Sequence, residues 1–133
     1  MNWIDRSLAL AIHAKMIATH GGATELRAES ALLAGLHRAK NLYAYGDPKP
    51  DIADLAAVYA GGVVLNHPFV DGNKRTGFML AYAFIRLNGY DFTAPEAEAA
   101  VWTLKFAARA CSESEYAAWL RSHAKKKRKP RPR

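Results

Sequence analysis

The sequence predicts an all-α fold, a single compact domain of about six helices. Apolar residues recur every three or four positions along most of the chain, which is the period of an amphipathic helix. Capping residues and glycines punctuate these stretches, and no stretch shows the apolar–polar alternation of a half-buried strand. With 133 residues, the chain is long enough to bury a core without a disulfide or a structural metal.

The first two helices are predicted by their apolar stripes. One begins after Asp5, a possible N-cap, and stops at Gly21-Gly22; its stripe is Ile4, Leu8, Ile12 and Met16. The second covers about residues 28–43, with a stripe of Leu32, Leu36, Ala39 and Tyr43. The run Gly46-Asp47-Pro48-Lys49-Pro50 then forces a loop.

Two further helices are expected to form the centre of the domain. The third begins at Asp51 and runs past Gly61-Gly62, a pair that costs helix stability unless a neighbouring backbone approaches closely there. The fourth covers about residues 73–88 and ends at Gly89. It carries no charge from Gly77 to Ile85, so we expect it to be the buried central helix.

Two capping-box patterns predict the last helices. Thr93-Ala94-Pro95-Glu96 would open a helix over about 94–109, and Ser112-Glu113-Ser114-Glu115 one over about 113–124. The segment 43–51 is the only place where a short hairpin would fit.

The positive charge is concentrated at the C-terminus. The net charge is +7, and seven of the nineteen lysines and arginines lie in 125–133, which leaves twelve cations against twelve anions in the rest. We therefore expect a folded domain over 1–124 and a disordered basic tail over 125–133. A neutral body argues against a nucleic-acid-binding face, although a binding protein that uses only this tail stays open as an alternative function.

The cellular setting is predicted from what the sequence does not contain. The single cysteine, Cys111, excludes an internal disulfide. No export signal opens the chain, and no apolar run reaches the ~20 residues that span a bilayer. We expect a cytoplasmic protein with no membrane partner.

Chemistry-bearing residues cluster in the segment 67–77, His-Pro-Phe-Val-Asp-Gly-Asn-Lys-Arg-Thr-Gly. Its second half begins a helix, whose free N–H groups and dipole bind phosphate oxygens. Gly72 permits close backbone approach and Asn73 can orient an oxygen, while Lys74 and Arg75 add positive charge. Pro68 and Phe69 are expected to be structural.

Two residues of the segment suit catalysis beside those phosphates. The carboxylate of Asp71 would repel them unless a cation intervened, which favours magnesium held by Asp71 and by the phosphates. His67 is suited to take a proton from an attacking hydroxyl. Each residue also has an ordinary interpretation: a helix-end histidine, a turn, an N-cap or a solvated pair of cations.

The order of these residues resembles the signature of the Fic/Doc (Fido) family, and more closely that of its death-on-curing (Doc) toxin branch. The similarity extends over about residues 4–110 and includes Gly21-Gly22, Leu32–Gly46 and Leu87-Asn88-Gly89. It implies an all-helical Fic/Doc domain with the active-site loop between two central helices. It also implies ATP as cosubstrate, with Mg²⁺, and a protein hydroxyl as acceptor.

Family roles then fall on matching positions of this sequence. The resemblance implies that His67 is the general base, Asp71 the magnesium ligand, Gly72 and Asn73 the phosphate-binding turn, and Arg75 a phosphate clamp. Lys74 occupies a position that is usually glycine in adenylylating members. It favours the Doc activity, transfer of the terminal phosphate of ATP, with elongation factor Tu as the implied target. Adenylylation remains the alternative, because Pro68 and Gly72 have the general Fic form.

The resemblance also implies how the enzyme is restrained and how it holds its target. The inhibitory motif of the family, Ser or Thr followed four residues later by Glu, does not occur in this sequence. Restraint would therefore come from a separate Phd-like antitoxin whose disordered segment folds on binding. The loop 43–51 is expected to be the flap that aligns the target.

Overall fold

Six helices and one small sheet make up the protein in a computed structural model that describes residues 1–127. The elements are α1 (Arg6–His20), α2 (Glu29–Tyr45), α3 (Ile52–Val64), α4 (Asn73–Leu87), β1 (Tyr90–Phe92), α5 (Glu96–Ala107), α6 (Glu113–His123) and β2 (Ala124–Lys126). The predicted all-α fold of about six helices is confirmed. In the part of the chain described, no helix is both long and apolar enough to cross a membrane.

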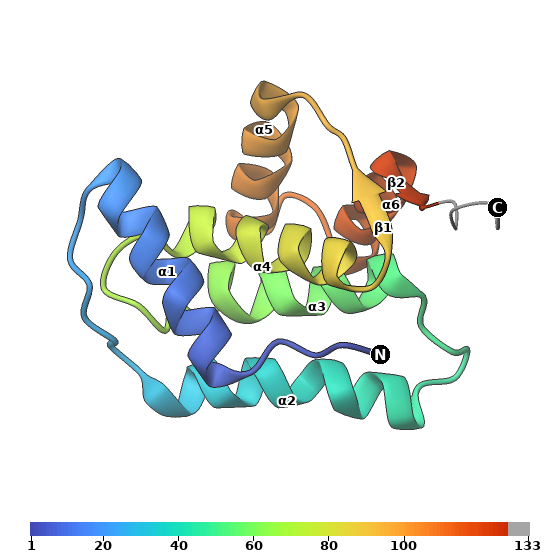
Figure 1. Ribbon diagram of the computed structural model, residues 1–133, viewed down its shortest axis with the longest axis horizontal. Coiled ribbons are helices and arrows are strands. Elements are labelled where there is room, and N and C mark those ends of the chain that lie inside the picture. The colour runs from blue at the N-terminus through green and yellow to red at the C-terminus, as the bar shows by residue number, and fades with distance from the viewer. Residues whose placement is uncertain (128–133) are drawn as a thin grey trace, which may run out of the picture.

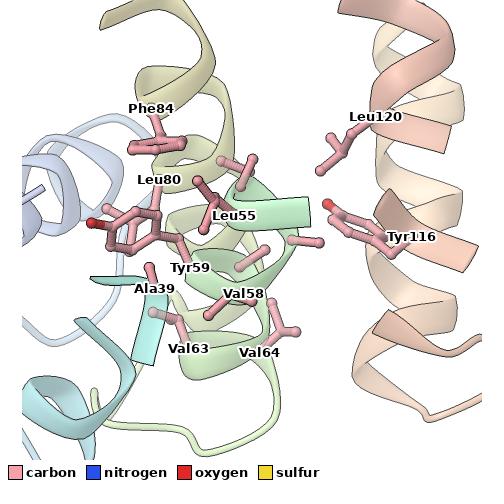
Figure 2. Packing of buried hydrophobic residues seen from close by; sticks show 14 of the residues in the cluster. Ala39, Leu55, Val58, Tyr59, Val63, Val64, Leu80, Phe84, Tyr116 and Leu120 are labelled. Atoms are coloured by element: carbon pink, nitrogen blue, oxygen red, sulfur yellow. The ribbon is translucent and has the colours of Figure 1, made fainter. Parts of the chain in front are cut away.

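Helix α3 is the centre of the fold, and α2, α4 and α6 pack around it (Figure 1). Eleven of its thirteen residues are buried. Figure 2 shows Leu80 and Phe84 of α4 and Tyr116 and Leu120 of α6 reaching toward α3 from different sides. Tyr59 of α3 stacks obliquely on Phe84 and accepts a hydrogen bond from the backbone N–H of Ile4, which ties the N-terminal segment to the core.

The prediction that α4 is the enclosed helix was therefore wrong. Its uncharged stretch is buried on the side of α3, but Phe78, Met79, Tyr82 and Ala83 are only half-buried. Phe78, Met79 and Tyr82 border an open groove, because α5 projects from the body and covers only part of α4 (Figure 1). Absence of charge on a helix does not tell whether a neighbour covers every face.

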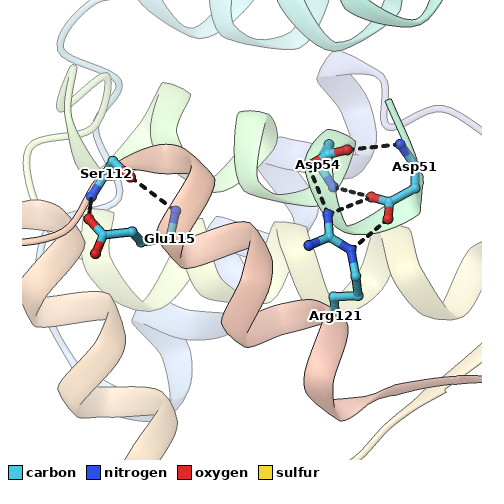
Figure 3. Close-up of polar contacts among 5 residues, drawn as sticks. All are labelled: Asp51, Asp54, Ser112, Glu115 and Arg121. Carbon is cyan, nitrogen blue, oxygen red and sulfur yellow. Dashed lines mark hydrogen bonds and ion pairs between the residues drawn. The ribbon is translucent and has the colours of Figure 1, made fainter. Parts of the chain in front are cut away.

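The helix starts follow the predicted caps with one exception. Asp5 accepts from the N–H of Leu8, and both Asp51 with Asp54 and Ser112 with Glu115 form complete capping boxes (Figure 3). Thr93 does not cap α5, which begins at Glu96 after Pro95 without a side-chain cap. The backbone N–H of Thr93 bonds the carbonyl of His123 instead, next to the sheet.

The two strands were not predicted. β1 and β2 are antiparallel, with Tyr90 opposite Lys126 and Phe92 opposite Ala124. The expected hairpin in 43–51 was wrong, since neither strand lies there. Disorder of the basic tail was wrong for Lys125 and Lys126, whose backbone is paired, while residues 128–133 lie outside the described part. The paired stretch lies next to the C-terminal end of α4 (Figure 1).

Arg121 joins the end of α6 to the start of α3 (Figure 3). Its guanidinium donates to both carboxylate oxygens of Asp51, at 2.6 and 3.1 Å, and to Asp54 at 2.9 Å. The hydrogen bond from Arg121 lowers the pKa of Asp51 to about 2. Folding thus favours the ionised carboxylate.

This shift predicts a pH dependence of stability. A carboxyl whose pKa is lowered by folding stabilises the protein above its unfolded pKa of about 4, and loses that contribution as pH falls through about 2. Because these side chains are about half exposed, we expect Arg121→Ala to cost only about 1 kcal/mol at neutral pH. Urea unfolding between pH 7 and pH 2 should show a shallower acid loss in this variant, and an unchanged slope would contradict the prediction.

Candidate active site

The segment 67–77 forms the connection from α3 into the first turn of α4. It lies at one end of the domain beside the connection between α1 and α2 (Figure 1). The two connections are joined: the N–H groups of Arg27 and Ala28 donate to the carbonyl of Pro68 at 2.7 and 2.9 Å, and Val70 donates to Glu25. Leu26 and Phe69 form an isolated antiparallel bridge. The predicted loop between two packed helices is therefore held from the side by residues 25–28.

His67 follows the C-terminal end of α3 and has a left-handed conformation with φ of +47°. Its N–H bonds the carbonyl of Val63 at 3.0 Å, and its side chain is exposed. A non-glycine residue held in this region costs about 1–3 kcal/mol, and such strain collects at functional sites. The carbonyl of His67 accepts two hydrogen bonds from the guanidinium of Arg27.

Phe69 anchors the loop in the core, as predicted, and is 1% exposed. Its ring stacks on the buried imidazole of His13 with centroids 3.7 Å apart. Nε2 of His13 lies 2.8 Å from the backbone carbonyl of Asp71 and must carry the proton, because a carbonyl only accepts. His13 thereby holds both ends of the turn that precedes α4.

Asp71 stands at the end of this turn with its side chain against the Gly22 segment. One carboxylate oxygen accepts from the N–H of Ala23 at 2.7 Å, and the described residues provide no partner for the other. The same residues contain no group of three acidic, histidine or cysteine side chains able to hold a metal. Asp71 thus fits a magnesium ion that takes its other ligands from phosphates and water.

The start of α4 offers an anion site made of backbone. Gly72 adopts φ of +80°, a left-handed conformation that glycine allows without strain. The first helical hydrogen bond between loop and helix runs from the N–H of Thr76 to the carbonyl of Gly72. The N–H groups of residues 73–75 therefore lie ahead of the hydrogen-bond ladder, where a phosphate binds most readily.

The side-chain amide of Asn73 was expected to face a ligand, but it points into the loop. Its side chain is 8% exposed and makes two hydrogen bonds to the backbone of Phe69, at 2.9 and 3.1 Å. The amide closes the loop, so any contact from Asn73 to a phosphate falls to its backbone N–H. The side chain was expected to orient a ligand because its neighbours in space were unknown.

Lys74 and Arg75 project from the first turn of α4 and are exposed. Neither makes an ion pair within the described part of the chain. They border a groove of about 240 Å³ between α1, α4 and α5, which is also lined by Met16, His20, Phe78, Met79 and Ala100. A larger groove of about 650 Å³ continues along α4 and α5 and shares Phe78 and Met79 with the first.

Thr76 is fully buried, and its hydroxyl is the one buried side-chain polar atom without a hydrogen-bond partner among residues 1–127. An unsatisfied buried hydroxyl costs about 1–3 kcal/mol. We therefore expect Thr76→Val, which keeps the shape, to stabilise the protein by about 1 kcal/mol in urea unfolding.

Thr103 supplies a matched control for that prediction. It is also buried, but its hydroxyl lies 2.9 Å from that of Tyr116. Thr103→Val leaves the Tyr116 hydroxyl unpaired, so this variant should be less stable than the wild type. Destabilisation by both substitutions would mean that the Thr76 hydroxyl has a partner in solution.

Two residues of the site were missed from the sequence, His13 and Arg27. A weak signal existed for His13: the buried positions of α1 are Ala9, His13 and Ile17, a stripe one residue along from the predicted one. A histidine in the middle of such a stripe needs a polar partner. Arg27 lies in the connection between α1 and α2, where apolar residues show no helical or strand period. No local sequence pattern therefore indicated that Arg27 would reach the site.

The expected flap is not near the site. Residues 46–51 connect the end of α2 to the start of α3, whereas His67 follows the other end of α3 (Figure 1). A helix of thirteen residues separates them by about 20 Å. The flap assignment for 43–51 was therefore wrong, and the connection that touches the signature is 21–28.

Comparison with known proteins gives two matches. A family model described as the Fic/DOC family matches residues 3–85. The protein Toxin Doc of Mycolicibacterium smegmatis (strain ATCC 700084 / mc(2)155) is 34% identical over 74 residues, which are 56% of this chain and 57% of that protein. The match thus spans less than two thirds of the relative. Both agree with the resemblance drawn from the signature.

Proposed function

Because this chain belongs to the Fic/DOC family, we propose that it is a Doc-like toxin that transfers the terminal phosphate of ATP to a hydroxyl of a protein. The observation that carries the proposal is the start of α4, where free N–H groups follow Gly72 and the cations Lys74 and Arg75, which form no ion pair among residues 1–127, project beside them. This arrangement suits the phosphates of a nucleotide. Elongation factor Tu is the proposed target, and the cytoplasm the proposed place of action.

The reaction assigns separate tasks to these residues. The N–H groups of 73–75 and the Arg75 guanidinium bind phosphate oxygens and take up charge as it develops. His67 accepts the proton of the attacking hydroxyl while the new oxygen–phosphorus bond forms and the bond to the ADP leaving group breaks. Asp71 would hold Mg²⁺, which supplies charge neutralisation between the phosphates when bound.

Lys74 is the reason for preferring phosphate transfer to AMP transfer. Its side chain occupies space beside the phosphate turn and adds a charge there, which favours a nucleotide bound with its terminal phosphate toward His67. AMP transfer remains the second candidate, because Pro68 and Gly72 match the general Fic signature. The same His67 would serve as base in either reaction, so the two differ in which phosphorus is attacked.

Labelled ATP distinguishes the two reactions. The protein is incubated with elongation factor Tu, Mg²⁺ and ATP labelled on either the α or the γ phosphate. Label transferred from the γ position alone supports the kinase, and label from the α position alone would overturn it in favour of AMP transfer. Lys74→Gly should lose transfer of the γ phosphate, and an unchanged rate would mean that Lys74 does not determine which phosphate is transferred.

An antitoxin encoded separately is the proposed partner. The groove along α4 and α5 is lined mostly by apolar side chains and begins beside Lys74 and Arg75. A helix folding into this groove would bury its apolar side and cover both cations. The proposal predicts a short gene immediately upstream, and co-expression of that gene should abolish the toxicity of the wild type. If toxicity persists, that neighbour is not the antitoxin.

A further inference from the structure

Arg27 donates hydrogen bonds to the backbone carbonyls of His67 and Pro68. Its guanidinium donates to the carbonyl of His67 from Nε at 2.9 Å and from Nη2 at 2.7 Å. Its own backbone N–H donates to the carbonyl of Pro68 at 2.7 Å. One residue, forty positions away in sequence, therefore holds two consecutive peptide groups of the signature.

The first of these peptide groups controls where the imidazole of His67 points. The φ of +47° already places His67 in a conformation that a non-glycine residue leaves readily. The direction of the carbonyl sets the remaining backbone angle of His67, and two donors in a rigid fork fix that direction. Without them, the His67 carbonyl has no hydrogen-bond donor among residues 1–127, so the peptide between His67 and Pro68 can turn and shift the side chain.

The bonding of Arg27 differs from that of the other arginines that bind through their side chains. Arg6, Arg38 and Arg121 each donate to carboxylates. The side-chain acceptors of Arg27 are the backbone carbonyls of His67 and Asn66, and no carboxylate pairs with it in residues 1–127. The guanidinium of Arg27 therefore acts on the backbone of the signature, at the residue that is the candidate base.

We propose that Arg27 is a positioning residue which keeps His67 in reach of the acceptor hydroxyl. This inference rests on the proposed function, in which His67 is the base. It assigns no contact between Arg27 and the nucleotide. Loss of the guanidinium should slow the chemical step while ATP still binds, because the phosphate-binding N–H groups belong to α4.

The test compares Arg27→Ala, Arg27→Lys and the matched control Arg6→Ala. Arg6 is likewise an exposed arginine that bonds through its guanidinium, but both of its hydrogen bonds go to the side chain of Glu29 and none to the signature. Arg27→Ala should lower kcat by about tenfold or more, as expected for a misplaced base. The KM for ATP should stay within about twofold. Lysine keeps a charged donor group but loses the planar fork, so Arg27→Lys should restore part of kcat, and Arg6→Ala should match the wild type.

Nuclear magnetic resonance supplies a readout that does not depend on activity. The Cα and Cβ chemical shifts of His67 report its backbone conformation and should move in Arg27→Ala but not in Arg6→Ala. Unmoved His67 shifts, or a rise in KM that accounts for the whole loss, would overturn the positioning role; so would equal losses in the alanine and lysine variants. If the wild type transfers no phosphate or AMP, the proposed function fails, whereas the shifts still decide whether Arg27 holds His67.

Discussion

Replacement of His67 by alanine is expected to lower the transfer rate by about 10²- to 10⁴-fold, the usual contribution of a general base. The side chain is exposed and makes no hydrogen bond in the described structure, whereas the backbone of His67 makes the contacts that hold the loop. Alanine should therefore remove the base and leave the fold intact. Steady-state transfer of labelled phosphate to elongation factor Tu measures kcat, and ATP titration measures KM, which should change little.

His37 provides the control for this substitution. It is an exposed histidine on α2, and His37→Ala should keep wild-type activity and wild-type stability. Toxicity in cells offers an independent measurement, since His67→Ala should be harmless where the wild type arrests growth. If His67→Ala were as toxic as the wild type, this result would contradict an enzymatic mechanism and favour a protein that acts only by binding.

Gly62→Val is expected to destabilise the fold by about 3 kcal/mol, the upper part of the range for overpacking a core. A Cβ at Gly62 would lie 3.0 Å from the Cα of Gly35, so α2 and α3 are in backbone contact there. Backbone atoms of two helices move apart only if the helices themselves separate. Urea unfolding followed by circular dichroism gives the change in free energy, and a variant as stable as the wild type would mean that α2 tolerates this shift.

The adjacent glycine is the matched control for the crossing. A Cβ at Gly61 would meet Cζ of Phe106 at 3.1 Å and Oε2 of Glu113 at 3.2 Å, both near the ends of side chains. These atoms can shift, and alanine is favoured over glycine within a helix by about 1 kcal/mol. Gly61→Ala should therefore be close to neutral. A similar large loss at both positions would point to general helix disruption rather than to the backbone crossing.

The predicted close approach at Gly61-Gly62 illustrates how far local reasoning extends. A glycine pair inside a strong helix pattern implies a neighbouring backbone, because nothing else compensates its cost to the helix. The prediction was right for Gly62, which contacts the backbone of Gly35 in α2. The residues around Gly35 do not show that this glycine is the partner. Similarly, one of the two predicted capping boxes, Ser112 with Glu115, was found, whereas the N–H of Thr93 bonds the carbonyl of His123 next to the sheet and Thr93 caps no helix.

That the candidate site residues of 67–77 lie together could be predicted from the sequence, because they are neighbours in the chain. The glycine at the start of α4, the following cations and the preceding carboxylate are placed by the geometry of one turn and one helix end. What holds them was not readable. His13 and Arg27 reach the loop from 58 and 40 residues away, and local periodicity carries no information about such distant pairs.

The order of apolar and capping residues in the chain was enough to specify helices, their approximate ends and the position of the turn before α4, since all three follow from interactions within a few residues. Three other features depended on which surfaces meet. Helix α3 rather than α4 became the enclosed helix, Lys125 and Lys126 joined a strand instead of a free tail, and the connection 21–28 took the place beside His67 that 43–51 was expected to hold. Packing brings together residues that are remote in sequence, and burial and pairing then override the preferences of each segment alone.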